Sequence, residues 1–136
     1  MAITQLTVGD VMQPQPHWVD AYQSLHAAKT KMVREKIRHL PVLREGVPIG
    51  ILSERDIRLA YAIPLPNVDD LPVGDVCVDQ PFVADPDEPL QKVALEMAEH
   101  RYGCTLVVRG DKLLGIFTTV DACRAVARLL GEGGTG

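Results

Sequence analysis

Short apolar runs bounded by turn-forming residues recur along the chain and predict β-strands. The four predicted strands are Leu40–Leu43, Ile49–Leu52, Thr105–Val108 and Leu113–Phe117. They lie in two pairs, joined by the tight turns Glu45–Gly46 and Gly110–Asp111. The pattern therefore predicts two β-hairpins, each with one glycine, Gly50 or Gly115, inside its second strand.

An amphipathic helix is predicted before each hairpin, because apolar residues recur there at helical spacing. These residues are Tyr22, Leu25, Ala28, Met32 and Val33 in the first helix, and Leu90, Val93, Ala94, Met97 and Ala98 in the second. Asp20 and Asp87 are expected to act as N-caps. A short helical turn, Thr7–Met12 or Pro72–Cys77, and a proline-bounded extended piece, 16–19 or 81–84, precede each helix.

The two sets of elements are copies of one unit. Residues 7–62 align with residues 72–127 without a gap, and sixteen of these positions are identical. We therefore predict two β-α-β-β-α repeats, with boundaries at 1–62 and 72–130, a linker over 63–71 and a flexible tail over 131–136. The fold class is α/β (α+β). A three-stranded unit exposes one sheet face, so the two sheets are expected to pack face to face.

The second strand of each hairpin runs into the same motif, Gly-apolar-apolar-Ser/Thr-x-x-Asp, and two interpretations of it stay open. In the first, Ser53 and Thr118 cap the following helices, with Asp56 and Asp121 as their capping-box partners. In the second, the glycines allow a ligand to approach closely, and the hydroxyl and carboxylate groups bind a sugar diol beside a helix N-terminus that favours phosphate.

The order and duplication of three segments resemble a tandem cystathionine-beta-synthase (CBS) domain pair, or Bateman module. The segments are Gly9–Met12, Leu40–Leu43 and Gly50–Asp56, each with its copy, and the resemblance extends from about residue 7 to residue 130. It implies a pseudo-twofold arrangement with two clefts that bind adenosyl ligands such as AMP, ADP, ATP or S-adenosylmethionine.

The resemblance also implies that each cleft takes residues from both repeats, with the aspartate on the ribose hydroxyls. Cleft one would use Thr7, Met12, Ile37 and Arg38 with Thr118, Val120 and Asp121. Cleft two would use Pro72, Cys77, Tyr102 and Gly103 with Ser53, Arg55 and Asp56.

The two clefts are not equivalent in sequence. Arg38 and His39 supply positive charge where the second repeat has Gly103 and Cys104, so cleft one has the fuller set of polar groups. In cleft two, the Arg55 guanidinium suits a phosphate.

Composition argues against several other functions. The chain has 136 residues and a net charge of −4, and its 14 basic residues form no stripe, so no nucleic-acid partner is expected. No apolar run approaches the roughly 20 residues that span a bilayer, and no secretory signal is evident, so we expect no membrane partner and a cytoplasmic location. The three cysteines fit reduced thiols.

The sequence does not indicate an enzyme. It lacks a nucleophile-elbow serine motif and the glycine-rich loops that bind nucleotides for catalysis, and the four histidines match no closed metal site. Asp10 and Asp75 each follow a glycine in a turn, where capping explains them. A redox role for Cys77 and Cys104 is disfavoured, because nothing nearby in sequence would lower a thiol pKa.

These observations predict a stand-alone regulatory module that requires no cofactor, binds an adenosyl ligand and signals to an unknown protein target. By the same resemblance, two chains would pair into a disc of four repeats, burying Ala122, Ala125, Val126 and Leu129. The alternative is a dimerising interaction scaffold with degenerate, empty clefts.

Overall fold

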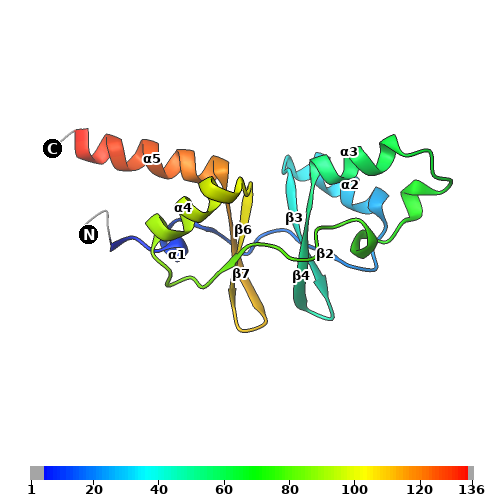
Figure 1. The fold of residues 1–136 in the computed structure, drawn as a ribbon, viewed down its shortest axis with the longest axis horizontal. Coiled ribbons are helices and arrows are strands. Elements are labelled where there is room, and N and C mark those ends of the chain that lie inside the picture. Colours follow the sequence, from blue (N-terminus) through cyan, green and yellow to red (C-terminus); the bar gives the residue numbers. More distant parts are fainter. Residues whose placement is uncertain (1–4, 135–136) are drawn as a thin grey trace. The chain divides into compact units, whose positions relative to one another are not determined.

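The computed structural model describes residues 5–134 and divides them into two compact units (Figure 1). One unit contains residues 16–81, and the other contains residues 5–15 together with 82–134. The leading turn of the first repeat therefore belongs to the same unit as the body of the second. The units and the predicted repeat boundaries differ for this reason, although the elements themselves are repeated.

The unit of residues 16–81 is built on a three-stranded sheet in the order β2-β3-β4. Strand β2 is parallel to β3, and β3 is antiparallel to β4. Its elements are β2 (Val19–Asp20), α2 (Leu25–Glu35), β3 (His39–Arg44), β4 (Val47–Ser53), α3 (Glu54–Ala62) and the 3₁₀ turns η2 (Val68–Asp70) and η3 (Val73–Asp75). The predicted linker thus contains a 3₁₀ turn, and the Leu71 carbonyl accepts a hydrogen bond from the Leu25 N–H at 2.8 Å.

The other unit has a four-stranded sheet in the order β1-β7-β6-β5. Its elements are α1 (Val8–Val11), β1 (Gln13–Pro14), β5 (Val83–Ala84), α4 (Leu90–His100), β6 (Cys104–Arg109), β7 (Lys112–Thr118) and α5 (Thr119–Gly134). The fourth strand, β1, comes from the leading segment and pairs antiparallel with β7. The predicted α+β class with two sheets is confirmed, whereas the face-to-face packing stays a prediction.

Both predicted N-caps of the amphipathic helices are wrong. Helix α2 is capped by Ser24, whose hydroxyl accepts from the Ala27 N–H at 3.1 Å, while Asp20 lies in β2 and accepts from the Tyr22 N–H. Helix α4 begins after Pro89 without a side-chain cap. The proline ring fixes the backbone φ before the helix but offers no side-chain acceptor to the N–H groups of its first turn.

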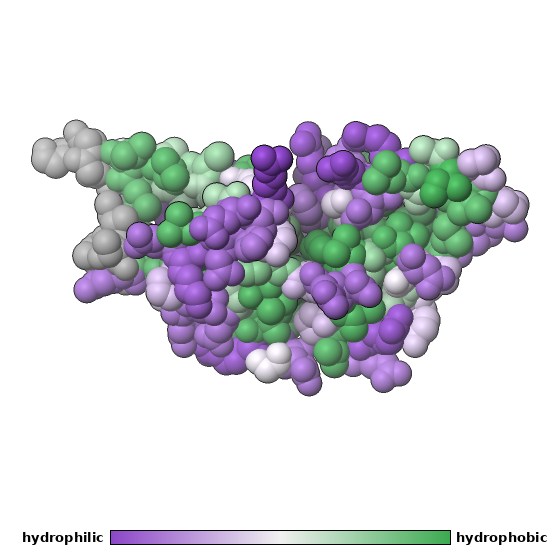
Figure 2. All heavy atoms as spheres, viewed as in Figure 1, coloured by the Kyte–Doolittle hydropathy of each residue, from purple (hydrophilic) through white to green (hydrophobic). Residues whose placement is uncertain are grey.

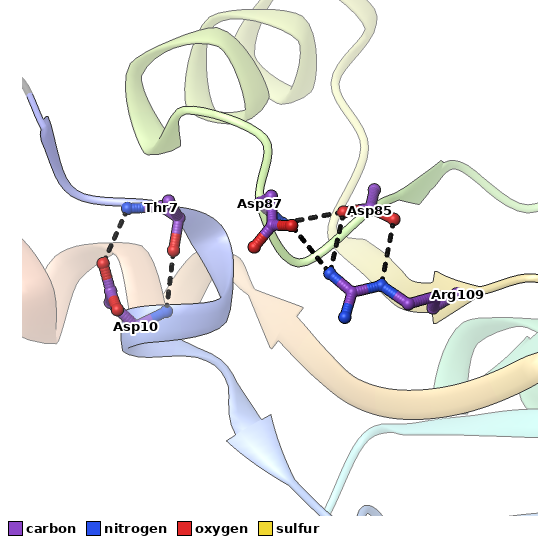
Figure 3. A network of polar contacts seen from close by, with 5 residues as sticks. All are labelled: Thr7, Asp10, Asp85, Asp87 and Arg109. Atoms are coloured by element: carbon purple, nitrogen blue, oxygen red, sulfur yellow. Dashed lines mark hydrogen bonds and ion pairs between the residues drawn. The ribbon is translucent and has the colours of Figure 1, made fainter.

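Asp87 instead takes part in an ion-pair cluster before α4 (Figure 3). The Arg109 guanidinium contacts Asp87 at 2.8 Å and Asp85 at 3.3 Å. The hydrogen bond from the backbone N–H of Asp87 holds the pKa of the Asp85 carboxyl below its ordinary value, and the hydrogen bond from Arg109 lowers this pKa further. The cluster ties the loop before α4 to strand β6.

Helix α5 continues to Gly134, where the sequence predicts a flexible tail from residue 131. Residues 135 and 136 of that tail lie outside the described residues. A glycine costs a helix only about 1 kcal/mol relative to alanine, so glycines near a terminus need not end one. Within residues 5–134, no helix combines the length and the hydrophobicity needed to cross a membrane.

Each unit has its own apolar core. In the unit of residues 16–81 the core joins Leu25, Ala28 and Met32 of α2 to Leu40 and Leu52 of the hairpin. In the other unit the core residues are Val8, Ala84, Val93, Met97, Val107 and Phe117. Of the helix positions that the apolar spacing predicts to be buried, Tyr22, Val33 and Ala98 are exposed, and Leu90 and Ala94 are half-buried. The other five are buried: Leu25, Ala28, Met32, Val93 and Met97.

Thr105 is a polar residue at a core position. It is fully buried, lies opposite Phe117 in the sheet, and its hydroxyl has no hydrogen-bond partner among the described residues. The equivalent position of the first repeat is Leu40, which is also fully buried. An unsatisfied buried hydroxyl is destabilising.

We predict that Thr105→Val raises the free energy of unfolding by about 1 kcal/mol, because valine keeps the shape and removes the hydroxyl. Urea denaturation followed by circular dichroism measures this change. The matched control is Leu40→Thr, which introduces the same hydroxyl into the other core and should destabilise the chain. A lower unfolding midpoint for Thr105→Val would contradict the prediction.

Candidate ligand-binding corners

Each Gly-to-Asp motif forms a corner where a strand turns into a helix. We name these the Asp56 corner (Gly50–Asp56, at β4 and α3) and the Asp121 corner (Gly115–Asp121, at β7 and α5). At both corners the glycine lies against the segment that opens a repeat, and we name residues 7–15 and 72–80 the leading segments. A Cβ on Gly50 would lie 2.5 Å from the Val78 carbonyl oxygen, and one on Gly115 would lie 2.7 Å from that of Gln13. The space beside each glycine, which the second interpretation gives to a ligand, is therefore filled by the backbone of the chain itself.

The hydroxyl and carboxylate groups of the corners form the predicted helix caps. Ser53 Oγ accepts from the Asp56 N–H at 3.1 Å, and Asp56 Oδ2 accepts from the Ser53 N–H at 2.9 Å. At the other corner, Thr118 Oγ1 accepts from the Asp121 N–H at 3.2 Å, and Asp121 Oδ2 accepts from the Thr118 N–H at 2.9 Å. The capping interpretation is confirmed, and it uses only one carboxylate oxygen at the Asp56 corner.

The Asp121 carboxylate has additional partners. Gln13 Nε2 lies 2.8 Å from each of its oxygens, and Thr118 Oγ1 also donates to Oδ2 at 2.9 Å. Arg124 Nη1 lies 3.5 Å from Oδ1. With these partners Asp121 is only 6% exposed, which a charged side chain tolerates because its oxygens are hydrogen-bonded.

Sequence reasoning missed Gln13. The repeat alignment pairs it with Val78, so the second copy has no equivalent amide, and Gln13 lies just outside the Gly9–Met12 motif. Its position follows from strand pairing, since Gln13 pairs with Ile116 beside Gly115. Only the pairing of β1 with β7 shows that its amide reaches the Asp121 corner.

The residues predicted for cleft one are divided between the units. Thr7, Met12, Thr118, Val120 and Asp121 belong to one unit. There Thr7 caps α1 in a capping box with Asp10 (Figure 3), and Met12 packs on Gly115. Val120 is 56% exposed on the first turn of α5.

The unit of the Asp56 corner contains Ile37, Arg38 and His39, which the sequence assigns to cleft one together with Asp121. The Arg38 carbonyl accepts from the Glu54 N–H at 2.9 Å, and its guanidinium, 83% exposed, lies 3.5 Å from Glu54 Oε2. Their role in cleft one stays a prediction.

The residues predicted for cleft two are divided in the same way. The unit of residues 16–81 contains Pro72, Cys77, Ser53, Arg55 and Asp56. The other unit contains Tyr102 and Gly103. The Gly103 carbonyl accepts from the Thr119 N–H at 3.1 Å, so its backbone supports the Asp121 corner.

Burial controls the titration of the groups near the corners. It lowers the pKa of His39, against the opposing effect of the Asp56 charge. It raises the pKa of the Cys77 and Cys104 thiols, which keeps them protonated and unreactive. In the described part of the chain, no group of three or more His, Cys, Asp or Glu side chains is placed to hold a metal ion.

Comparisons with known proteins agree with this fold. Over 97% of its length the chain is similar to a protein assigned to acetoin utilization, AcuB, of Vibrio cholerae, with 28% identity, 98% coverage of that chain and a TM-score of 0.89. CBSX2 of Arabidopsis thaliana, solved in complex with AMP, is 27% identical with a TM-score of 0.81, over 91% of this chain and 98% of that one.

The CBS domain pair of protein MJ0100, solved with 5′-methylthioadenosine and S-adenosyl-L-methionine, is 25% identical with a TM-score of 0.80, over 89% of this chain and 95% of that one. Among curated relatives, the chain is 29% identical over 131 residues to homoserine O-acetyltransferase of Methanohalophilus mahii. That match covers 94% of this chain but only 25% of the relative. The model of the CBS domain family matches twice, at residues 8–63 and 73–128, and the chain therefore belongs to this family.

Proposed function

We propose that the chain is a regulatory module that binds an adenosyl ligand at its two corners and passes the occupancy to a partner protein. The observation that carries this proposal is the Asp56 corner. There a partly buried carboxylate stands at the N-terminus of α3, and among the described residues only the Ser53 N–H donates to it. The complexes of CBSX2 with AMP and of MJ0100 with S-adenosyl-L-methionine support the ligand class.

The chemistry of the corner suits a ribose phosphate. An ionised carboxylate has about four lone-pair sites, so Asp56 can accept from a ribose diol while it caps the helix. The N–H groups and dipole of the helix N-terminus favour a phosphate, and Arg55 lies exposed in the same turn. Arg38, immediately before β3 and exposed, adds a second cation.

A second copy of the chain is the proposed partner of α5. Exposed apolar residues follow one stripe of this helix, namely Val120, Cys123, Val126, Ala127 and Leu130, part of the apolar surface over α5 in Figure 2. This stripe matches the face predicted from sequence only in part, because Val126 lies on it whereas Leu129 is half-buried. Ala125 is buried, and Ala122 packs against the core of its own unit, so neither is free for a partner.

A specific observation also favours the alternative of an interaction scaffold with empty sites. Both corners complete their capping boxes within the chain, and Gln13 occupies the Asp121 carboxylate, so neither corner needs a ligand for its structure. Ligand titration separates the two functions.

We predict that Asp56→Ala and Asp121→Ala each weaken AMP or S-adenosylmethionine binding at their own corner by about 1.5–3 kcal/mol, roughly ten- to a hundredfold in Kd. The reason is that each change removes a charged acceptor for the ribose hydroxyls. Isothermal calorimetry on the full chain measures it, after circular dichroism has shown that the variants are folded.

Asp10→Ala is the matched control for that experiment. Asp10 makes the same capping box with Thr7, at the short helix α1, so its loss costs a similar cap without removing a corner carboxylate. If all three variants bind like the wild type, the corner aspartates are caps and the corners are not the ligand sites. If the wild type binds neither ligand, the proposed ligand-binding function is refuted and the scaffold remains.

We further predict that Leu130→Glu converts a dimer into a monomer, because it places a charge in the apolar contact that the proposed dimer buries. Leu130 is 69% exposed within one chain. Light scattering at micromolar concentration gives the mass. Arg128→Glu, which places the same carboxylate on α5 but off the stripe, should leave the dimer intact. A wild-type protein that is already monomeric would show the prediction to be wrong.

A further inference from the structure

The Gln13 side chain contacts the Asp121 carboxylate where a diol would have to bind. Its Nε2 donates at 2.8 Å to both Oδ1 and Oδ2. A ribose diol binds a carboxylate with two O–H donors on the same two oxygens. Gln13 therefore makes, within the chain, the contacts that the proposed ligand would make.

The remaining partners of Asp121 leave little capacity for a ligand beside Gln13. Oδ2 also accepts from the Thr118 N–H and hydroxyl, each at 2.9 Å, and Arg124 approaches Oδ1. A carboxylate offers about four lone-pair sites, and Gln13 and Thr118 make four hydrogen bonds to this one, with Arg124 nearby as an ion-pair partner. A ligand at this corner must first displace the Gln13 amide.

The backbone holds Gln13 in this position. Strand β1 pairs with β7 so that Gln13 faces Ile116 and Pro14 faces Gly115. A Cβ on Gly115 would lie 2.7 Å from the Gln13 carbonyl oxygen, so the pairing requires the glycine. The amide is thus presented by a fixed segment of the sheet.

The other corner has the same backbone and a different side chain. Val78 pairs with Ile51 through hydrogen bonds of 2.9 Å and 3.0 Å, in the register that Gln13 has with Ile116. Valine has no donor, and among the described residues only the Ser53 N–H donates to Asp56. Asp56 therefore keeps acceptor sites available.

We infer that Gln13 is a specificity-determining residue that competes with the ligand for Asp121, so that the Asp56 corner is the primary site. The inference rests on the proposed function. It reverses the ranking expected from sequence, in which the cleft of Asp121 is the better supplied. A ligand can bind the Asp121 corner only while the Gln13 amide is displaced, so the affinity of this corner is reduced by the fraction of time that it is open. A hydrogen bond to a charged group makes that open fraction about a tenth to a hundredth.

The test exchanges the two side chains. Gln13→Val gives the Asp121 corner the residue of the other repeat, and Val78→Gln gives the Asp56 corner an amide. Calorimetric titration with AMP should show Gln13→Val binding about ten- to a hundredfold more tightly at the Asp121 corner, and Val78→Gln more weakly at the Asp56 corner. The double variant Gln13→Val with Asp121→Ala should lose the gain, which assigns it to that corner.

Thermal unfolding without ligand separates competition from a merely structural role. Gln13→Val removes a hydrogen bond from a buried charge, so its melting temperature should fall while its affinity rises. A structural role alone would lower both. If Gln13→Val does not fold, Gln13→Met, which keeps the length and lacks the donor, takes its place.

The outcomes distinguish this inference from the proposed function. AMP binding by the wild type, with unchanged or weaker binding by Gln13→Val, overturns the inference and leaves the proposed function standing. No AMP binding by the wild type or by any variant overturns both.

Discussion

The contact of two leading segments with two glycines is the constraint on which the rest of the structure depends. Any side chain at Gly115 would overlap Met12 and Gln13, and any side chain at Gly50 would overlap Cys77 and Val78. Without a Cβ there, β1 pairs with β7, and Val78 pairs with Ile51. These pairings bring the leading segment of one repeat onto the body of the other, which is why the compact units cross the repeat boundaries.

The same contact determines what the corners present. Each strand ends a few residues beyond its glycine, at Ser53 or Thr118, and the helix that follows begins with a capping box. The leading segment lies alongside this strand end, so the residue paired with the position after the glycine faces the corner. In one unit that residue is Gln13, and in the other it is Val78. The backbone pairing at this position is the same in both copies, and the side chain that it presents to the corner differs.

The sequence predicts those features of the fold that depend on local pattern. The hairpins and the helices after Ser53 and Thr118 follow from apolar spacing and cap chemistry, and all of them are present. The pattern predicts the wrong caps for α2 and α4. Asp20 and Asp87 are residue types that can cap a helix, but Asp20 lies in β2 and Asp87 forms an ion pair with Arg109. The pattern missed Gln13, because a contact between residues 13 and 121 depends on strand pairing across the chain.

Capping and ligand binding are compatible roles for the corner aspartate at the Asp56 corner. A capping box uses one oxygen of the carboxylate, as Asp56 does with the Ser53 N–H. The remaining lone pairs of both oxygens are free to accept hydrogen bonds from a diol, and the cap holds the carboxylate in place beforehand, which lowers the entropic cost of binding. At Asp121 the same cap is present, but a neighbouring amide uses the remaining capacity. A duplicated fold can therefore keep the cap in both copies, where stability requires it, and differ in ligand binding through one residue outside the motif.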